Sequence, residues 1–336
     1  MLSRLFFEQL VKPIVQDAIP SIPYAAARIG KGSEVLGLDD EISQDHDWGP
    51  RLQLFLKKKD FCKYESILNE KLKYDLPPSF EGFSTCWSDP DEFKTQVLTQ
   101  TKENEVKHRV EIYTVDNFLK EECNIELKDD YSPIEWLNFR EQALLEFTSG
   151  DVFHDDLGHL TKTRQKLAYY PDGVWKYRMV NEWAVLDDLK TFMGRAASRG
   201  DRVGAMIITT EQIKRLMSLG FMLERRYIPY EKWFGTCFSQ LPIGKILTPL
   251  LDEILKEGDW VKRESLICDA GLQLLEKHNE LTITEHIPIA KEKFYNREHT
   301  ILDYPSIIKE LKAQMQPPLD EIPPMHEIPL DFSSFV

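Results

Sequence analysis

The sequence predicts an α+β protein, in which an N-terminal domain with a small mixed sheet and helices precedes an all-α helical bundle. Short β-like segments are confined to about the first 125 residues, and in one of them apolar residues alternate as is typical of strands. From about residue 126 to 315, apolar residues recur at helical spacing instead. A chain of 336 residues, 42% of them hydrophobic, is long enough for two cores. We therefore expect domains at 1–125 and 126–315, followed by a proline-rich tail at 316–336.

The N-terminal domain is predicted to contain two helical segments and three strands. Residues 1–18 are amphipathic at helical spacing, and residues 64–74 form a helix that ends before two prolines. In the second predicted strand, Leu52, Leu54 and Leu56 alternate with Arg51 and Gln53, which is the period of a strand with one packed face. The three strands are expected at 24–29, 51–56 and 109–115.

The second domain is predicted to be a bundle of helices. A long helix is expected over 174–192, and the helix over 210–227 is apolar on nearly all sides, which indicates a central position in the bundle. Residues 150–159 contain two glycines together with three aspartates and two histidines, and we interpret them as a loop of turn and capping residues rather than a metal site. The prolines after residue 316 indicate an extended tail.

The charge of the chain disfavours a dedicated nucleic-acid binder. The formal net charge is −14, which repels nucleic acid and anionic membranes over most of the surface. The 42 lysines and arginines still allow a local basic pocket for phosphate groups.

Cysteine spacing and hydropathy favour a cytoplasmic protein. The five cysteines contain no CxxC pair, so neither a zinc site nor a disulfide framework is indicated. The N-terminal segment lacks the unbroken apolar stretch of a secretory signal. No window approaches 18 consecutive apolar residues, so we expect no membrane span.

A turn of small residues follows the first predicted strand. Gly30, Gly32 and Ser33 come directly after residues 24–29. Small residues let backbone N–H groups approach a phosphate closely, and Ser33 adds a hydroxyl donor. The turn therefore predicts a phosphate-binding site.

Two aspartates, Asp45 and Asp47, stand at the entry to the next predicted strand. Residues i and i+2 of a strand point to the same face, so we expect the two carboxylates to project together. Carboxylates that close repel each other unless a cation lies between them, and Mg²⁺ suits such oxygen ligands. Glu111 alternates away from Val110 and Ile112 on the third strand, and we predict that it completes a two-metal site.

The acidic residues also admit a simpler interpretation, a solvated acidic loop formed with Asp39, Asp40 and Glu41. Such a loop accounts for the charge. It accounts neither for the small-residue turn before it nor for the strand after it, so the combination favours the phosphate and metal site.

The segment 32–49 resembles the nucleotidyltransferase superfamily, with its DNA polymerase beta-like fold, whose members share a Gly-Ser turn followed by Asp-x-Asp on the next strand. From about residue 20 to 310 the chain also resembles a bacterial family of predicted nucleotidyltransferases with a helical C-terminal domain. The order of domains is similar to that of aminoglycoside and lincosamide nucleotidyltransferases. The residues that carry the closer likeness are 32–49, 169–175, 194–195, 200–201 and 224–233.

This resemblance implies transfer of a nucleoside monophosphate from a nucleoside triphosphate, expected to be ATP, to an acceptor hydroxyl with release of pyrophosphate. It places Gly32 and Ser33 at the triphosphate and puts Asp45 and Asp47 on Mg²⁺. Two departures matter. Residues 43–45 hold one residue more between serine and the first aspartate than many members do, and no strong motif fixes the third carboxylate.

Residues 224–233 concentrate cations and aromatic side chains. We expect Arg225 and Lys232 to bind the phosphates of the nucleotide. The alternative is a helix C-terminus whose cations complement the helix dipole and pair with Glu224 or Glu231.

The expected function is therefore a cytoplasmic, Mg²⁺-dependent nucleotidyltransferase acting on a small hydroxylated acceptor, because the net charge opposes RNA. Transfer to a protein or tRNA is a second possibility, and an inactive, nucleotide-binding regulatory protein is a third. A purely structural interaction protein is disfavoured because it leaves the Gly-Ser and Asp-x-Asp arrangement without a cause. The sequence names neither the acceptor nor an oligomeric state.

Overall fold

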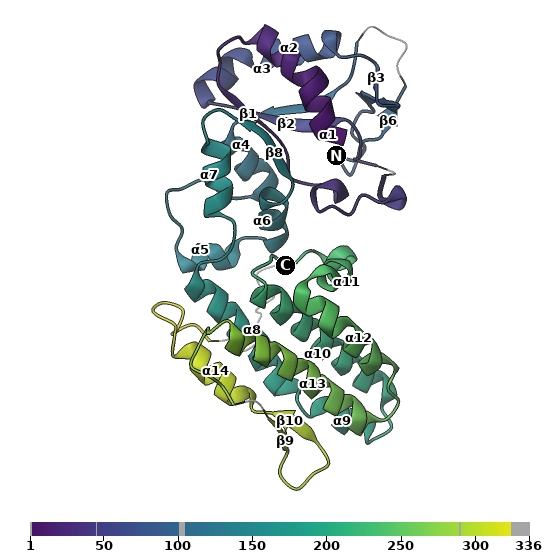
Figure 1. The fold of residues 1–336 in the computed structure, drawn as a ribbon, viewed down its shortest axis with the longest axis vertical. Helices are drawn as coiled ribbons and strands as arrows, with labels where there is room; N and C mark the ends of the chain where they lie inside the picture. Colours follow the sequence, from purple (N-terminus) through teal and green to yellow (C-terminus); the bar gives the residue numbers. More distant parts are fainter. Residues whose placement is uncertain (1, 45, 101–104, 289, 324–336) are drawn as a thin grey trace, which may run out of the picture. The chain divides into compact units, whose positions relative to one another are not determined.

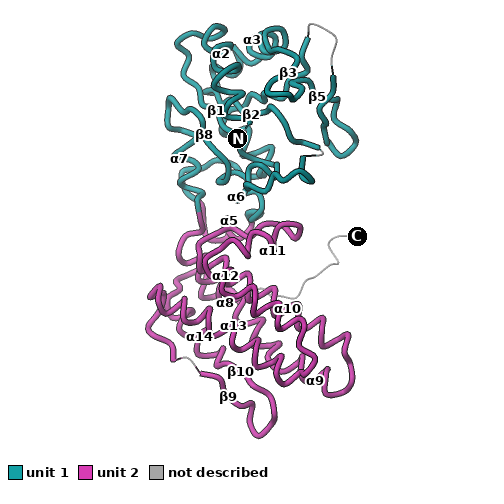
Figure 2. Tube along the Cα trace, turned by 45° about the vertical axis from the view of Figure 1, so that its right-hand side comes forward, with its two compact units in different colours: residues 1–130, 139–168 teal, residues 131–138, 169–336 magenta. Residues whose placement is uncertain are grey.

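The chain folds into two compact units in the computed structural model, which describes residues 2–44, 46–100, 105–288 and 290–323. The first unit comprises residues 1–130 and 139–168, and the second comprises residues 131–138 and 169–336 (Figure 2). The first unit therefore extends past the boundary expected near residue 125.

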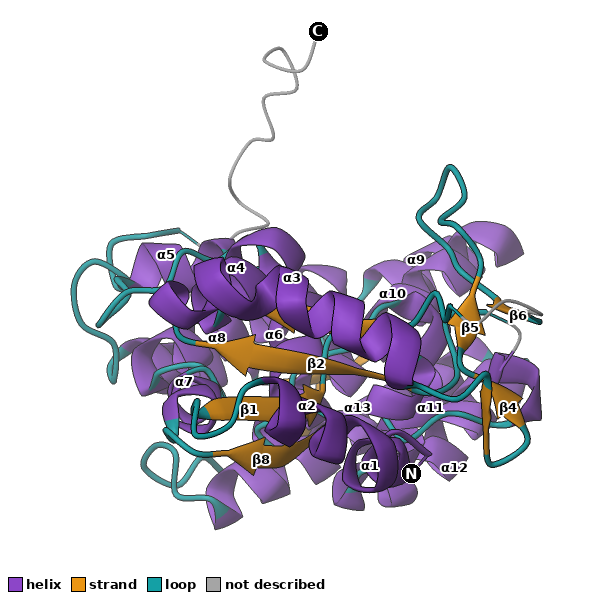
Figure 3. Ribbon diagram, turned by 90° about the horizontal axis from the view of Figure 1, so that it is seen from above, coloured by secondary structure: helices purple, strands orange, loops and turns teal. Residues whose placement is uncertain are grey.

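A four-stranded mixed sheet forms the centre of the first unit (Figure 3). β1 pairs antiparallel with both β2 and β8, whereas β2 pairs parallel with β7. The predicted α+β class is confirmed, and three of the strands lie where the alternating segments placed them. In spatial order the strands are β7 (Arg109–Tyr113), β2 (Arg51–Leu56), β1 (Tyr24–Arg28) and β8 (Asp151–Asp155).

Strand β8 corrects the interpretation of residues 150–159 as a loop. It pairs with β1, so that Asp155 lies opposite Ala25 and Asp151 lies opposite Arg28. Gly150 precedes it with φ +70°, and a Cβ atom there would lie 2.1 Å from the carbonyl oxygen of Arg28. This close approach requires glycine, and the pairing explains why residues 139–168 belong to the first unit.

Helices cover the face of the sheet that carries Leu52, Leu54 and Val110. These residues are buried in a hydrophobic core with residues of the N-terminal helices and of α3. The helix predicted over 64–74 lies within α3. The helical elements on this face are α1 (Leu2–Phe6), the π-helix η1 (Phe7–Val11), α2 (Lys12–Ala18) and α3 (Lys58–Asp75).

The second face of β2 is buried as well, which corrects the prediction of a strand packed on one side only. Arg51 and Gln53 are 2% and 3% exposed. On this side Phe55 contacts Phe118, with ring centroids 5.6 Å apart, and Phe118 contacts Phe147. The helical elements that follow β7 in the first unit are α4 (Val115–Phe118), the π-helix η4 (Leu119–Cys123), α6 (Glu141–Thr148) and α7 (His159–Lys166).

Short elements connect the sheet strands of the first unit. Two 3₁₀ turns, η2 (Ser33–Val35) and η3 (Glu41–Gln44), lie between β1 and β2. Two small antiparallel pairs lie between α3 and β7, formed by β3 (Ser79–Phe80) with β4 (Phe83–Ser84) and by β5 (Cys86–Trp87) with β6 (Leu98–Thr99).

The second unit is a helical bundle (Figure 1), as predicted, to which a small β-hairpin is added. The central helix is α10, which contacts α8, α9, α12 and α13. The long helix expected over 174–192 is α8. The elements are α5 (Pro133–Asn138), α8 (Asp172–Leu189), α9 (Phe192–Ala197), α10 (Arg202–Leu223), α11 (Glu231–Gln240), α12 (Pro242–Lys256), α13 (Trp260–Glu280), β9 (Lys291–Lys293), β10 (Thr300–Leu302) and α14 (Tyr304–Lys312).

The described start of the proline-rich tail lies against α8. Leu319 is 3% exposed and lies next to Gly173. The Tyr177 hydroxyl donates to the carbonyl oxygen of Pro323, at 2.9 Å. Residues 324–336 of the predicted tail lie outside the described residues.

Among the helices of the described residues, none combines the length and the apolar character needed to cross a lipid bilayer.

Candidate functional site

The Gly-Ser turn predicted from the sequence follows β1 and leads into η2. Gly32 has φ +141°. A Cβ atom at this position would lie 2.4 Å from Arg28 Nη2, 2.4 Å from Glu34 Oε2 and 2.5 Å from Arg51 Nη2. Both the backbone conformation and the lack of space therefore require glycine.

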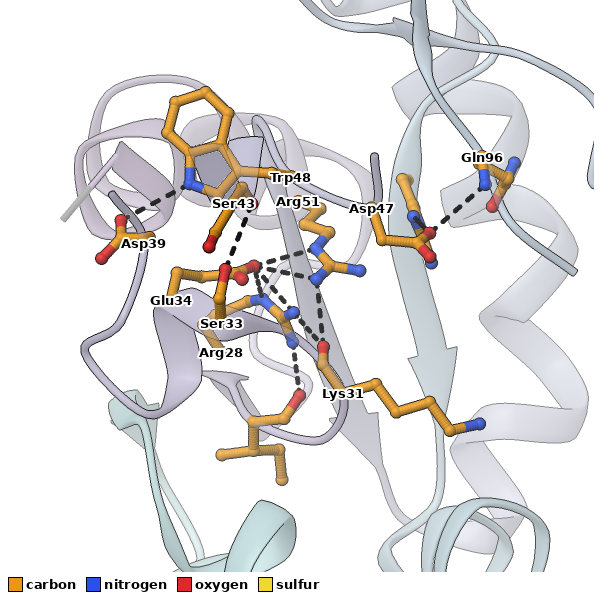
Figure 4. Close-up of polar contacts among 12 residues, drawn as sticks. Arg28, Lys31, Ser33, Glu34, Asp39, Ser43, Asp47, Trp48, Arg51 and Gln96 are labelled. Carbon is orange, nitrogen blue, oxygen red and sulfur yellow. Dashed lines mark hydrogen bonds and ion pairs between the residues drawn. The ribbon is translucent and has the colours of Figure 1, made fainter. Parts of the chain in front are cut away.

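A buried cluster of charged side chains lies under this turn, formed by Arg28, Glu34 and Arg51 (Figure 4). Glu34 Oε1 accepts from Arg28 Nε at 2.8 Å, from Arg51 Nε at 3.0 Å and from Arg51 Nη2 at 2.9 Å. Their side chains are between 1% and 5% exposed, so the charges interact with little screening by water. The cluster fixes the end of β1, the start of η2 and the start of β2 with respect to one another.

The protonation equilibria of the cluster reflect this burial. Burial lowers the pKa of Arg51 to about 9, and the charge of Arg28 adds to this effect. Burial alone would raise the pKa of Glu34, but the charges of Arg28 and Arg51 outweigh burial and lower it. Glu34 is therefore ionised at neutral pH.

The same arginines hold the backbone of the turn. Arg28 donates to the carbonyl oxygen of Ile29 at 2.5 Å and also to that of Lys31. Arg51 Nη2 donates to the carbonyl oxygen of Lys31 at 3.0 Å. This cluster was not predicted from the sequence. The feature that could have indicated it is Arg28, which ends an otherwise apolar strand and is followed six residues later by Glu34.

The turn leaves backbone donors available. Within the described part of the chain, the N–H groups of Lys31, Gly32 and Ser33 donate to no other group. The Ser33 hydroxyl donates to the carbonyl oxygen of Ser43, at 3.3 Å. Successive backbone N–H groups without partners are potential donors to an anion.

Asp47 lies in a bend before β2, not in the strand, so strand alternation does not set its direction as expected. Its φ is +50°, and its N–H donates to the carbonyl oxygen of Gln96 at 2.8 Å. Its Oδ1 atom accepts from Arg109 Nη1 and, at 3.4 Å, from the N–H of Gln96. Asp45, the other predicted aspartate, lies outside the described residues.

Glu111 lies on β7 opposite Gln53 of β2. Gln53 Nε2 donates to Glu111 Oε2 at 2.8 Å, and Gln53 Oε1 accepts from the N–H of Ile29 at 3.2 Å. Arg109 and Glu111 are two residues apart on β7, so their side chains share a face. The Arg109 contact therefore brings Asp47 to the face of the sheet that carries Glu111.

Asp47 and Glu111 offer carboxylate oxygens, the type of ligand that a hard cation such as Mg²⁺ binds. Asp47 Oδ2 and Glu111 Oε1 accept no hydrogen bond from the described residues, so each side chain keeps one free oxygen. The described residues contain no group of three histidine, cysteine or acidic side chains arranged to hold a metal ion. A complete ligand set would therefore need Asp45 as well.

Arg225 and Lys232 belong to the second unit. Arg225 Nη2 donates to Asp172 Oδ1 at 2.8 Å, and its guanidinium lies 3.8 Å from the centre of the Trp175 ring. Lys232 is exposed, with Nζ 4.7 Å from the centre of the Trp233 ring. Arg225 pairs with Asp172 rather than with the acidic neighbours named in the dipole interpretation.

Comparisons with known proteins give limited matches. Residues 136–234 match a family described as a domain of unknown function, DUF4037. No curated protein matches the chain. A solved structure, a nucleotidyltransferase-like protein from Exiguobacterium sibiricum, is similar at 13% sequence identity and a TM-score of 0.33, over 82% of this chain and 76% of that chain. A TM-score this low does not establish a common fold.

Proposed function

We propose that the first unit is a nucleotidyltransferase, which transfers a nucleoside monophosphate from a nucleoside triphosphate to a hydroxyl group of a small acceptor and releases pyrophosphate. One observation carries the proposal: Arg109 joins Asp47 to the face of β7 that bears Glu111, in the sheet whose strand β1 leads into the Gly32–Ser33 turn. A chain with a solvated acidic loop alone would need no such contact.

The turn supports binding of the triphosphate. The N–H groups of residues 31–33 carry no partner within the described residues, so they remain available as donors to an anion. Arg28 and Arg51 hold the carbonyl oxygens of the turn, so the N–H groups are fixed before a ligand arrives. A preformed donor site loses less conformational entropy on binding.

The carboxylates support the transfer step. Asp47 and Glu111, together with Asp45, are the residues that would hold Mg²⁺. When bound, Mg²⁺ neutralises phosphate charge and lowers the pKa of the attacking hydroxyl. The work of the protein is then to position the triphosphate and the acceptor.

The pairing of Asp47 with Arg109 favours a second candidate function. An aspartate already neutralised by arginine binds a cation less readily, as expected for a nucleotide-binding protein without turnover. The two functions differ in whether nucleotide binding requires Mg²⁺ and whether pyrophosphate is released.

Thermal unfolding of the full chain with each nucleoside triphosphate, with and without Mg²⁺, tests the proposal. At about 100 times its Kd a ligand stabilises the folded state by about 2.7 kcal/mol, which for a unit of this size raises Tm by about 5–10 °C. We expect the shift to require Mg²⁺, and we expect it to disappear in Asp47→Asn and in Glu111→Gln.

Asp252→Asn and Glu253→Gln on α12 are matched controls, since both residues are exposed and change charge in the same way. They should keep the shift. Release of pyrophosphate with a panel of hydroxylated small molecules then separates the transferase from the binding protein. An equal shift in wild type, Asp47→Asn and Glu111→Gln would refute the proposed site.

A further inference from the structure

The second unit contains a pocket of about 340 Å³ where helices α8, α10 and α13 meet. The first turn of α8 and the C-terminal ends of α10 and α13 form its walls. The volume lies within the range of small-molecule sites. The charged and aromatic residues in the lining are Asp172, Trp175, Lys176, Glu224, Arg225 and Lys277.

The two carboxylates of the lining already have partners. Asp172 Oδ1 accepts from Arg225 Nη2 at 2.8 Å. Glu224 Oε1 accepts from the N–H of Ile243 at 3.2 Å. Asp172 therefore offsets the charge of Arg225, whereas the hydrogen bond from an uncharged N–H group leaves Glu224 with its full negative charge in the lining.

The two lysines remain without a close counter-ion. Lys176 makes no ion pair within the described residues, and its charge helps burial to lower the pKa of the neighbouring His278 to about 4. Among the described residues, Lys277 pairs only with Glu280, at 3.9 Å, and that glutamate side chain is 71% exposed. A pair this long and this exposed is screened by water and contributes little.

Arg225 is fixed at the wall of the pocket. It follows the last turn of α10 with φ +49°, a conformation that glycine usually occupies after a helix. Its guanidinium stacks on Trp175, which is buried and donates through Nε1 to the carbonyl oxygen of Met222 at 2.9 Å. The Arg225 guanidinium is therefore held in one orientation, so its side chain loses little conformational entropy when a ligand binds.

We propose that this pocket binds a small dianion, a phosphate monoester or a dicarboxylate, between the ammonium groups of Lys176 and Lys277 and against the guanidinium of Arg225. Since Asp172 offsets Arg225, the two ammonium groups face one remaining carboxylate, Glu224, and the lining keeps an excess of positive charge that attracts an anion. The site uses neither Asp47 nor Glu111, so it does not depend on the proposed nucleotidyl transfer.

Titration calorimetry on the full chain tests this site with inorganic phosphate, pyrophosphate and succinate, at an ionic strength held constant with sodium chloride. We expect at least one of them to bind, and we expect Lys176→Gln and Lys277→Gln each to weaken binding about tenfold, as for loss of one charge-assisted hydrogen bond. Tighter binding of phosphate or pyrophosphate assigns the pocket to phosphate esters, whereas tighter binding of succinate assigns it to dicarboxylates.

Lys245→Gln on α12 is the matched control, because Lys245 is exposed and lies outside the pocket lining. It should bind as wild type does, and so should Asp47→Asn. Three results overturn the proposal: no binding of any of the three anions, binding unchanged in both lysine variants, or binding lost in Asp47→Asn but kept in the lysine variants. Unfolding temperatures without ligand show that the variants fold.

Discussion

Gly32 is confined by charged side chains rather than by apolar ones. Its missing Cβ leaves the space in which Arg28, Glu34 and Arg51 meet. The sequence predicted that Gly32 forms a turn, because small residues after a strand are a local signal. It did not predict the cluster below, because two arginines 23 positions apart in the numbering become neighbours only when β1 and β2 pair.

Replacement of Gly32 by alanine should destabilise the protein more than replacement of Gly37. Both residues have positive φ, but a Cβ atom at Gly37 would meet nothing within 4 Å. Gly37→Ala should cost about 1–2 kcal/mol, the price of a left-handed conformation, and Gly32→Ala should cost about 2 kcal/mol more because the cluster must move. Urea unfolding measures the loss of stability in both variants. Equal losses would show that the charged cluster can move at no cost to admit the Cβ atom.

Replacement of Glu34 by glutamine should weaken the fold at neutral pH and flatten its response to acid. The lowered pKa of Glu34 means that its contribution is complete above about 4.5, its ordinary value, and is lost as pH falls below that value. Removal of one partner from a buried ion cluster costs about 3–5 kcal/mol. Urea unfolding between pH 7 and pH 3 should therefore give converging stabilities for wild type and Glu34→Gln, with exposed Glu253→Gln following wild type throughout.

In the four-stranded sheet, the local sequence pattern predicts three strands and misses the fourth. β1, β2 and β7 were predictable because their apolar residues are contiguous or alternate. β8 has aspartate at both ends and lies at the edge of the sheet, where charged residues are common. Its partner strand β1 lies far away in the sequence, so no local signal marks it.

Hydrogen exchange should show β8 as part of the sheet. The amides of β8 that pair with β1 should exchange much more slowly than those of residues 89–94, which form no strand. Mass spectrometry of peptides from both segments makes the comparison within one sample. Equally fast exchange in the two peptides would contradict the strand and support the interpretation of residues 150–159 as a loop.

Each of the two compact units buries hydrophobic residues of its own. Leu68 on α3 and Leu247 on α12 are both fully buried, in the first and the second unit respectively. Units with separate cores can unfold in separate steps.

We therefore expect calorimetry to resolve two transitions, each sensitive to only one of two matched substitutions. Leu68→Ala and Leu247→Ala should each cost about 2–5 kcal/mol and lower a different transition by roughly 5–15 °C. A single transition shifted equally by both variants would show that the units unfold together.

Because the chain returns to the first unit at residue 139, neither unit can finish folding early in synthesis. A ribosome releases residues 1–130 and then α5, which belongs to the second unit, before it releases β8. The edge of β1 that pairs with β8 thus stays unpaired during synthesis until residue 155 has emerged. Helix α5 likewise lacks its packing partners until residues after 168 have been synthesised. No single cut of the gene yields either unit whole, and a shortened version of the first unit must carry α5 with it.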